Sequence, residues 1–97
     1  MKINTINNFN EKYKDYLPKG WYGLDIEIPK VIEYLDKLFE DELIKIPGFE
    51  YHQIKLKFGQ CRFYSNLMDL FDDFGYEKER EIEEDINNII KELGNKE

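Results

Sequence analysis

Apolar residues recur at helical spacing in four parts of the chain. The clearest part begins at Pro29, a residue that suits the first position of a helix. One face of this segment carries an apolar stripe made of Ile28, Val31, Ile32, Leu35, Leu38 and Phe39. The spacing therefore predicts a helix over residues 28–42, and it also predicts helices over residues 5–17, 67–74 and 77–93.

Glycine and proline mark the places where these helices should end. Pro18 and Gly20 are expected to stop the first helix, and Gly75 is expected to stop the third. Trp21 and Tyr22 stand between two glycines, which predicts a tight loop that carries an aromatic plug. We expect Trp21 to be buried in the core, although its flanking glycines leave a role in lining a pocket open.

A different pattern occupies the middle of the chain, where apolar and polar side chains alternate with the period of a strand. Gly59 and Gln60 would form a two-residue type II′ turn, because that turn requires glycine at its first central position. The turn predicts a hairpin with strands over residues 50–58 and 61–65. Combined with the helices, it predicts a single α+β domain over residues 1–97, in which a small antiparallel sheet packs against amphipathic helices.

The proposed turn also determines which side chains share a face of the hairpin. The core face would hold Ile54, Leu56, Phe58, Cys61 and Phe63. The polar face would hold Gln53, Lys55, Lys57, Arg62 and Tyr64. Lys57 would lie directly opposite Arg62, and such like charges destabilise a hairpin by roughly some tenths of a kcal/mol. A bound anion or nearby carboxylates would remove that penalty.

The hairpin's positive charges stand out in a chain with a net charge of −7. Arginine offers a planar fork to phosphate, lysine offers a point charge, and tyrosine offers a ring for stacking. The candidate ligand-binding residues are therefore Lys55, Lys57, Arg62, Tyr64, Gln53, Trp21 and Tyr22. Two structural roles are equally compatible with this pattern: the acids of residues 77–85 could neutralise the face, or the basic residues could protect an exposed sheet edge.

Composition narrows the range of partners. The chain is 41% apolar and 15% aromatic, which is typical of a folded domain. The negative charge argues against non-specific binding to duplex nucleic acid and to anionic lipid, but it permits a basic protein partner. No apolar run approaches a membrane span, and the first residues, MKINTINNFN, lack the apolar run of a signal peptide. We therefore expect a cytoplasmic protein without membrane contact.

Patterns for catalysis and metal binding are scarce. His52 is the only histidine, and strand alternation predicts that it points toward the core, with no nucleophile spaced to pair with it. Cys61 is the only cysteine, and we expect it to be a small buried apolar residue. The acids of residues 69–73 and 77–85 match neither a calcium-binding loop nor a two-metal arrangement. We therefore expect no enzyme activity, no cofactor and no metal.

The segments GWYGLDIEI, VIEYLDKLF, FEYHQIKLKFGQCRFY and EREIEEDINNIIKEL together resemble a family of small proteins encoded by bacteriophages and prophages. The resemblance covers about residues 20–93, and its specific part is the hairpin motif. The motif matches at Gln53, Ile54, Lys55, Lys57, Phe58, Gly59, Arg62, Phe63 and Tyr64. Many relatives carry Gly-Leu in place of Gln60 and Cys61, and many have a cysteine cluster after the last helix that is similar to a zinc site. This chain lacks that cluster, so the resemblance implies no metal here.

The resemblance also implies a biological context. Small phage proteins outside the virion often counter host defence, either by sequestering nucleotide immune signals or by blocking defence proteins. Our first expectation is therefore a non-enzymatic protein of the host cytoplasm that sequesters a small phosphorylated nucleotide on the basic hairpin face. The alternative is an acidic protein–protein inhibitor of a host defence or nucleic-acid-binding protein. A homo-oligomer is expected, because a chain of this size has little room for an enclosed pocket.

Overall fold

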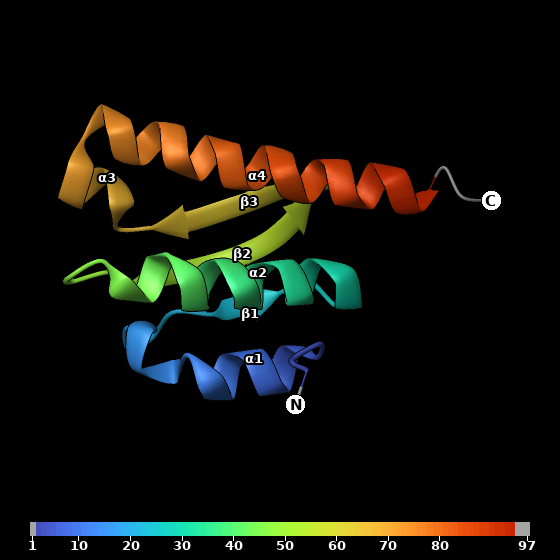
Figure 1. Cartoon of the computed structure of the whole chain (residues 1–97), viewed down its shortest axis with the longest axis horizontal. Helices are drawn as coiled ribbons and strands as arrows, with labels where there is room; N and C mark the ends of the chain where they lie inside the picture. Colours follow the sequence, from blue (N-terminus) through green and yellow to red (C-terminus); the bar gives the residue numbers. More distant parts are fainter. Residues whose placement is uncertain (1, 95–97) are drawn as a thin grey trace.

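Helices and strands follow one another in the order that the sequence predicts, with one additional strand. The structure is a computed structural model that describes residues 2–94. Its elements, shown in Figure 1, are α1 (Ile6–Lys12), the 3₁₀ helix η1 (Lys14–Tyr16), β1 (Gly23–Asp25), α2 (Pro29–Asp41), the 3₁₀ helix η2 (Leu43–Lys45), β2 (Tyr51–Lys57), β3 (Gln60–Ser65), α3 (Leu67–Phe71) and α4 (Asp73–Gly94). The predicted α+β class is confirmed.

The first two helices differ in how well the sequence predicts them. Pro29 begins α2, and the expected range of 28–42 is correct to within one residue at each end. The expected helix over residues 5–17 is too long, because α1 ends at Lys12 and η1 replaces its last turn. Leu17 is extended (φ −108°, ψ 110°), since a proline at position 18 disfavours helical conformation in the residue before it.

The sheet is mixed rather than purely antiparallel, which corrects the prediction. Its strand order is β1-β2-β3, with β1 parallel to β2 and β2 antiparallel to β3. The segment predicted as a loop with an aromatic plug instead leads into β1, where Leu24 pairs with Ile54. β1 has only three residues, which is too short for the alternation of apolar and polar side chains that identifies a strand in a sequence.

The hairpin turn lies one residue earlier than predicted. Phe58 and Gly59 are its central residues, with φ of 55° and 77°, as in a type I′ turn. The strands therefore cover Tyr51–Lys57 and Gln60–Ser65 instead of residues 50–58 and 61–65. Moving the turn by one residue shifts the cross-strand pairing by two, and a shift of two leaves residues 53–57 and 61–64 on their predicted faces. Phe58 leaves the predicted core face for the turn, and its side chain is 93% exposed.

A β-bulge corrects the predicted orientation of His52. The pairing of β2 with β3 is irregular between Tyr51 and Gln53, so His52 is the extra residue. Tyr51 is then buried, while His52 is half-buried and stacks against the ring of Trp21. Trp21 is 49% exposed, so the expectation that it lies in the core is wrong.

The last two helices meet at a sharp corner. The sequence predicts helices over residues 67–74 and 77–93. In the structure the boundary between the two helices is Asp72, which has the non-helical angles φ 53° and ψ −127°. Gly75 does not end a helix, because it lies buried in the first turn of α4. A Cβ atom on Gly75 would lie 2.0 Å from the carbonyl oxygen of Leu67, so only glycine lets α4 approach α3 this closely.

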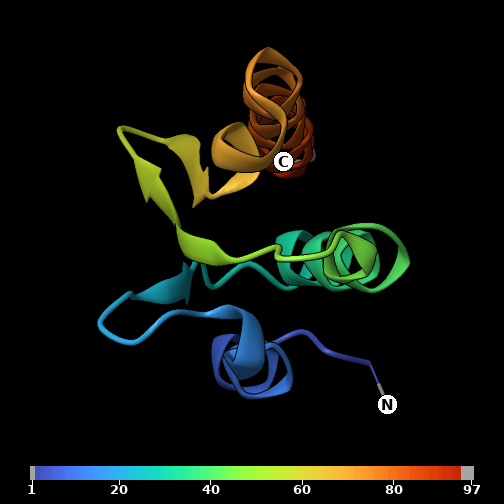
Figure 2. The same ribbon diagram turned by 90° about the vertical axis from the view of Figure 1, so that its left-hand side faces the viewer.

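The helices lie on one side of the sheet and leave the other side uncovered (Figure 2). Between helices and sheet lies a core in which aromatic rings meet edge to face, with the Phe39 ring 5.0 Å from Phe9 and 5.1 Å from Tyr51. Ile82 and Ile86 of α4 complete this core. The described charged residues form no part of the fully buried core.

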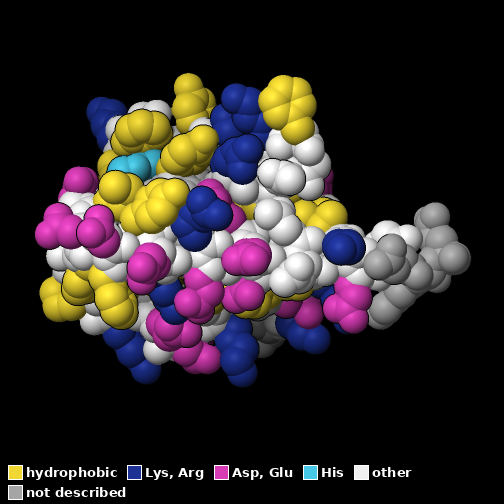
Figure 3. Space-filling view, turned by 90° about the horizontal axis from the view of Figure 1, so that it is seen from above, with side chains coloured by type: hydrophobic (Ala, Val, Ile, Leu, Met, Phe, Trp, Pro, Cys, Tyr) yellow, Lys and Arg dark blue, Asp and Glu magenta, His cyan; other side chains and the backbone are white. Residues whose placement is uncertain are grey.

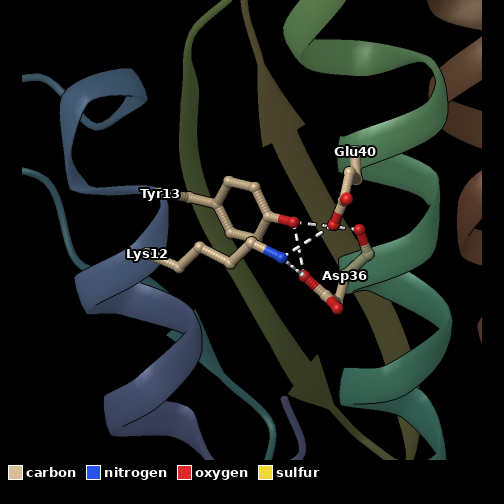
Figure 4. Close-up of polar contacts among 4 residues, drawn as sticks. All are labelled: Lys12, Tyr13, Asp36 and Glu40. Atoms are coloured by element: carbon tan, nitrogen blue, oxygen red, sulfur yellow. Dashed lines mark hydrogen bonds and ion pairs between the residues drawn. The ribbon is translucent and has the colours of Figure 1, made fainter. Parts of the chain in front are cut away.

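Polar contacts hold α1 against α2 and close the outer edge of β1. Figure 4 shows Lys12 and Tyr13 of α1 turned toward the acids of α2, with the Lys12 amine 2.8 Å from both Asp36 and Glu40. The Tyr13 hydroxyl also donates to the Asp36 carboxylate, and burial raises the pKa of Tyr13. The Asn10 side chain accepts from the Leu24 amide (3.0 Å) and donates to its carbonyl (3.2 Å), as a neighbouring strand would.

Replacement of Gly75 by alanine should lower the free energy of unfolding by about 1–3 kcal/mol, because the new methyl group would overlap the Leu67 backbone. Chemical denaturation measures this change. Gly94→Ala is the matched control, since no heavy atom lies within 4 Å of its added Cβ. Equal stability of the two variants would contradict the close packing of α3 on α4.

Candidate functional site

The uncovered side of the sheet carries the polar residues that the sequence places on one face. Strand pairing sets Asp25, Lys55 and Arg62 side by side across the three strands. In the neighbouring row Gln53 lies beside Tyr64. Paired residues project from the same side of a sheet, so these rows form one surface. We call this surface the open face, and it holds the predicted residues Gln53, Lys55, Lys57, Arg62 and Tyr64.

Like charges are opposed on the open face, though not the pair that the sequence predicts. Lys55 lies directly opposite Arg62, whereas Lys57 pairs with Gln60. Within residues 2–94, the ion pairs are formed by other cations, and none involves these three. Asp25 is the carboxylate in the same row, and sequence reasoning missed it because it missed β1. The face therefore keeps positive charge that no direct carboxylate contact neutralises.

Polar side chains of α4 accept hydrogen bonds from β3. The Cys61 amide donates to the Asn87 side chain (2.7 Å), and the Phe63 amide donates to the Glu83 carboxylate (2.9 Å). The Ser65 hydroxyl donates to Glu79 (2.5 Å), while burial raises the pKa of Glu79. These contacts close the outer edge of the sheet, which would otherwise present unpaired amides.

Arg62 is the hairpin cation that shares a recess with acids of α4. It lines a polar recess of about 290 Å³ together with Glu83, Glu84 and Arg80. The sequence left open that acids of α4 neutralise the basic face. Glu83 and Glu84 lie in the same recess as Arg62, but within residues 2–94 neither forms an ion pair with it. Lys57 extends beyond the recess toward the turn, where its amine lies 5.9 Å from the centre of the Phe58 ring.

Aromatic rings gather at the opposite end of the open face from the turn. The rings of Trp21 and His52 stack with centroids 4.7 Å apart and planes inclined by 24°. Tyr64 lies on the face itself and is 45% exposed. Tyr22 is 72% exposed, but no stacking contact ties it to the other rings. Figure 3 shows apolar and basic side chains gathered along the top of the view, above a band of Asp and Glu.

The remaining candidates behave as structural residues. Cys61 is buried, as predicted, and burial raises the pKa of its thiol to about 12. Among residues 2–94, no group of three or more His, Cys, Asp and Glu side chains is arranged to hold a metal ion. His52 was missed as a face residue because alternation alone cannot reveal a bulge.

The fold and the open face define a small α+β protein with a basic, partly aromatic sheet surface and an acidic helix at its edge. Comparisons with known protein families, with curated proteins and with solved structures found no match. In the part of the chain that the structure describes, no helix combines the length and the apolar character that crossing a membrane requires.

The thiol of Cys61 should resist alkylation in the native protein at pH 8, because burial hides it and keeps it protonated. Mass spectrometry after a pulse of iodoacetamide measures the modified fraction. In urea, Cys61 should become as reactive as a free cysteine over the same range of urea concentration in which circular dichroism reports unfolding. Rapid modification of the folded protein would contradict the burial of Cys61.

Proposed function

We propose that the protein binds a small phosphorylated nucleotide on the open face and does not turn it over. The observation that supports this most strongly is the set of cations without a direct carboxylate partner, Lys55, Lys57 and Arg62. Opposing Lys55 to Arg62 is unfavourable in the free protein, so a phosphate between them would relieve repulsion as well as gain charged hydrogen bonds.

The spacing of the face suits a nucleotide. Tyr64 and Arg62 are two residues apart on β3, which corresponds to about 7 Å along a strand. A ribose can bridge that distance, so a base could lie against Tyr64 while its phosphate meets Lys55 and Arg62. The Trp21 and His52 rings offer a second stacking surface at the same end of the face.

Charge favours a small ligand over a long nucleic acid. The chain has a net charge of −7, and the acidic band of α4 borders the basic face (Figure 3). A longer strand would have to cross that band, where its phosphates would be repelled. A nucleotide with few phosphates needs only the hairpin cations.

Binding without chemistry fits the state of the groups that could transfer protons. The His52 ring is stacked on Trp21, and the Cys61 thiol is buried and keeps its proton. A chain of this size has little room for an enclosed pocket, so we also propose that a second copy covers the open face. Strand addition is an unfavourable route to such an oligomer, because Asn10 occupies the edge of β1 and α4 occupies the edge of β3.

The resemblance of the hairpin motif to phage proteins suggests the biological role. In the cytoplasm of an infected host, the protein would sequester a nucleotide immune signal. Cyclic dinucleotides and ADP-ribose derivatives combine a stackable base with the phosphates that this face would bind.

Isothermal titration calorimetry with a panel of cyclic dinucleotides and ADP-ribose derivatives tests the proposal. At least one ligand should bind the wild-type protein, and Lys55→Ala and Arg62→Ala should each weaken binding by about tenfold or more, because each removes a charged hydrogen bond. Tyr64→Ala should also weaken it. The matched controls are Lys45→Ala and Tyr76→Ala, since Tyr76 is 46% exposed but lies on α4.

Failure of the whole panel to bind would overturn the proposal. Binding that survives both Lys55→Ala and Arg62→Ala would show that the ligand lies elsewhere. Chromatography of the titrated samples would detect any product, and formation of a product would show that the protein is an enzyme.

A further inference from the structure

A groove with an apolar floor and an acidic rim lies on the helical side of the molecule, between α2, α3 and α4. Its centre is a cavity of about 360 Å³ lined by the apolar side chains of Ile46, Leu67, Phe71 and Phe74. It shares Glu42 with a hollow beside Leu38, and it shares Phe74 and Lys78 with a hollow beside Glu77 and Glu81. We call the surface formed by these three neighbouring hollows the α2–α4 groove.

The aromatic side chains of the groove are exposed at a cost to the fold. Phe74 is 73% exposed and Phe71 is 45% exposed. Asp72, which lies between them at the corner, has a positive φ of 53°, a conformation that costs a non-glycine residue about 1–3 kcal/mol. The corner lets α4 pack closely on α3, but it leaves the two rings exposed, and exposed aromatic rings beside a cavity are typical of protein-binding surfaces.

The rim determines the charge of the occupant. Asp41, Glu42, Glu77 and Glu81 surround the apolar floor. Two lysines also line the groove: Lys78 pairs with Glu42 (3.0 Å) and Glu81 (3.7 Å), and Lys37 lines the hollow that contains Asp41. With four carboxylates against two lysines, the rim retains negative charge, which would attract a positively charged partner and repel an acidic one.

We propose that the α2–α4 groove docks a basic amphipathic segment of a partner protein. The segment would place an apolar side chain between Phe71, Phe74 and Ile46, and its lysines or arginines would meet the carboxylates of the rim. This surface is separate from the open face, so the inference does not rest on nucleotide binding. On this proposal, the acidic residues around the groove serve to attract a basic partner.

Selection from a library of random peptides displayed on yeast tests this inference. Peptides are selected for binding to the wild-type protein alone. The enriched peptides should carry apolar residues at helical spacing and a net positive charge. Calorimetry with a synthetic copy of an enriched peptide should show that Phe74→Ala and Glu77→Lys each weaken binding by about tenfold or more.

Two matched variants identify the surface. Phe58→Ala also removes an exposed phenylalanine, and Glu92→Lys makes the same charge change near the end of α4, so both should keep wild-type affinity. Circular dichroism checks that all variants fold. The proposal is overturned if selection enriches no peptide, if the enriched peptides are acidic or neutral, or if Phe74→Ala and Phe58→Ala bind equally well.

A second copy of the chain is the competing occupant, because its turn presents Phe58 beside Lys57. Sedimentation of the wild-type protein distinguishes this case. Self-association that both Phe58→Ala and Phe74→Ala abolish would assign the groove to a second copy and overturn the proposal of a separate partner. Binding of the selected basic peptides would support it if the protein is a monomer, or if its self-association survives both substitutions.

Discussion

The hydrogen bonds from the outer amides of β3 to side chains of α4 determine which surfaces of the molecule remain accessible. Asn87 accepts from Cys61 and Glu83 accepts from Phe63, while Ile82 and Ile86 bury the apolar side of the same helix. The helix is therefore held along the edge of the sheet, and the other face of the sheet stays uncovered (Figure 2). Glu83 binds the backbone of β3, and among the described residues it forms no ion pair with the hairpin cations.

This arrangement separates the charges of the chain onto two surfaces. Positive charge lies on the open face around Lys55 and Arg62, and negative charge lies along α4 and around the α2–α4 groove. The described non-glycine residues with positive φ, Phe58 and Asp72, each lie next to or within one of these surfaces. Such conformations are costly and concentrate at functional positions, which is consistent with the two binding surfaces that we propose.

The sequence predicts helices and strand faces well, but it predicts the positions of turns poorly. Apolar periodicity places α2 within one residue, because its buried stripe leaves one orientation possible. Alternation likewise assigns Lys55 and Arg62 to one face, and that assignment survives the error in the turn because the pairing moved by two residues. The turn itself was missed because phenylalanine at positive φ is rare. The bulge at His52, the short β1 and the close approach at Gly75 depend on contacts between distant segments, which local patterns do not contain.

Amide hydrogen exchange at Cys61 and Phe63, measured by NMR, most directly tests whether α4 closes the edge of the sheet. Both amides should exchange slowly although β3 is an edge strand of the sheet that residues 2–94 form, because each donates to a side chain of α4. Asn87→Ala should accelerate exchange mainly at Cys61, and Glu83→Ala should accelerate it mainly at Phe63. Fast exchange at both amides in the wild-type protein, or slow exchange that neither substitution changes, would contradict this arrangement.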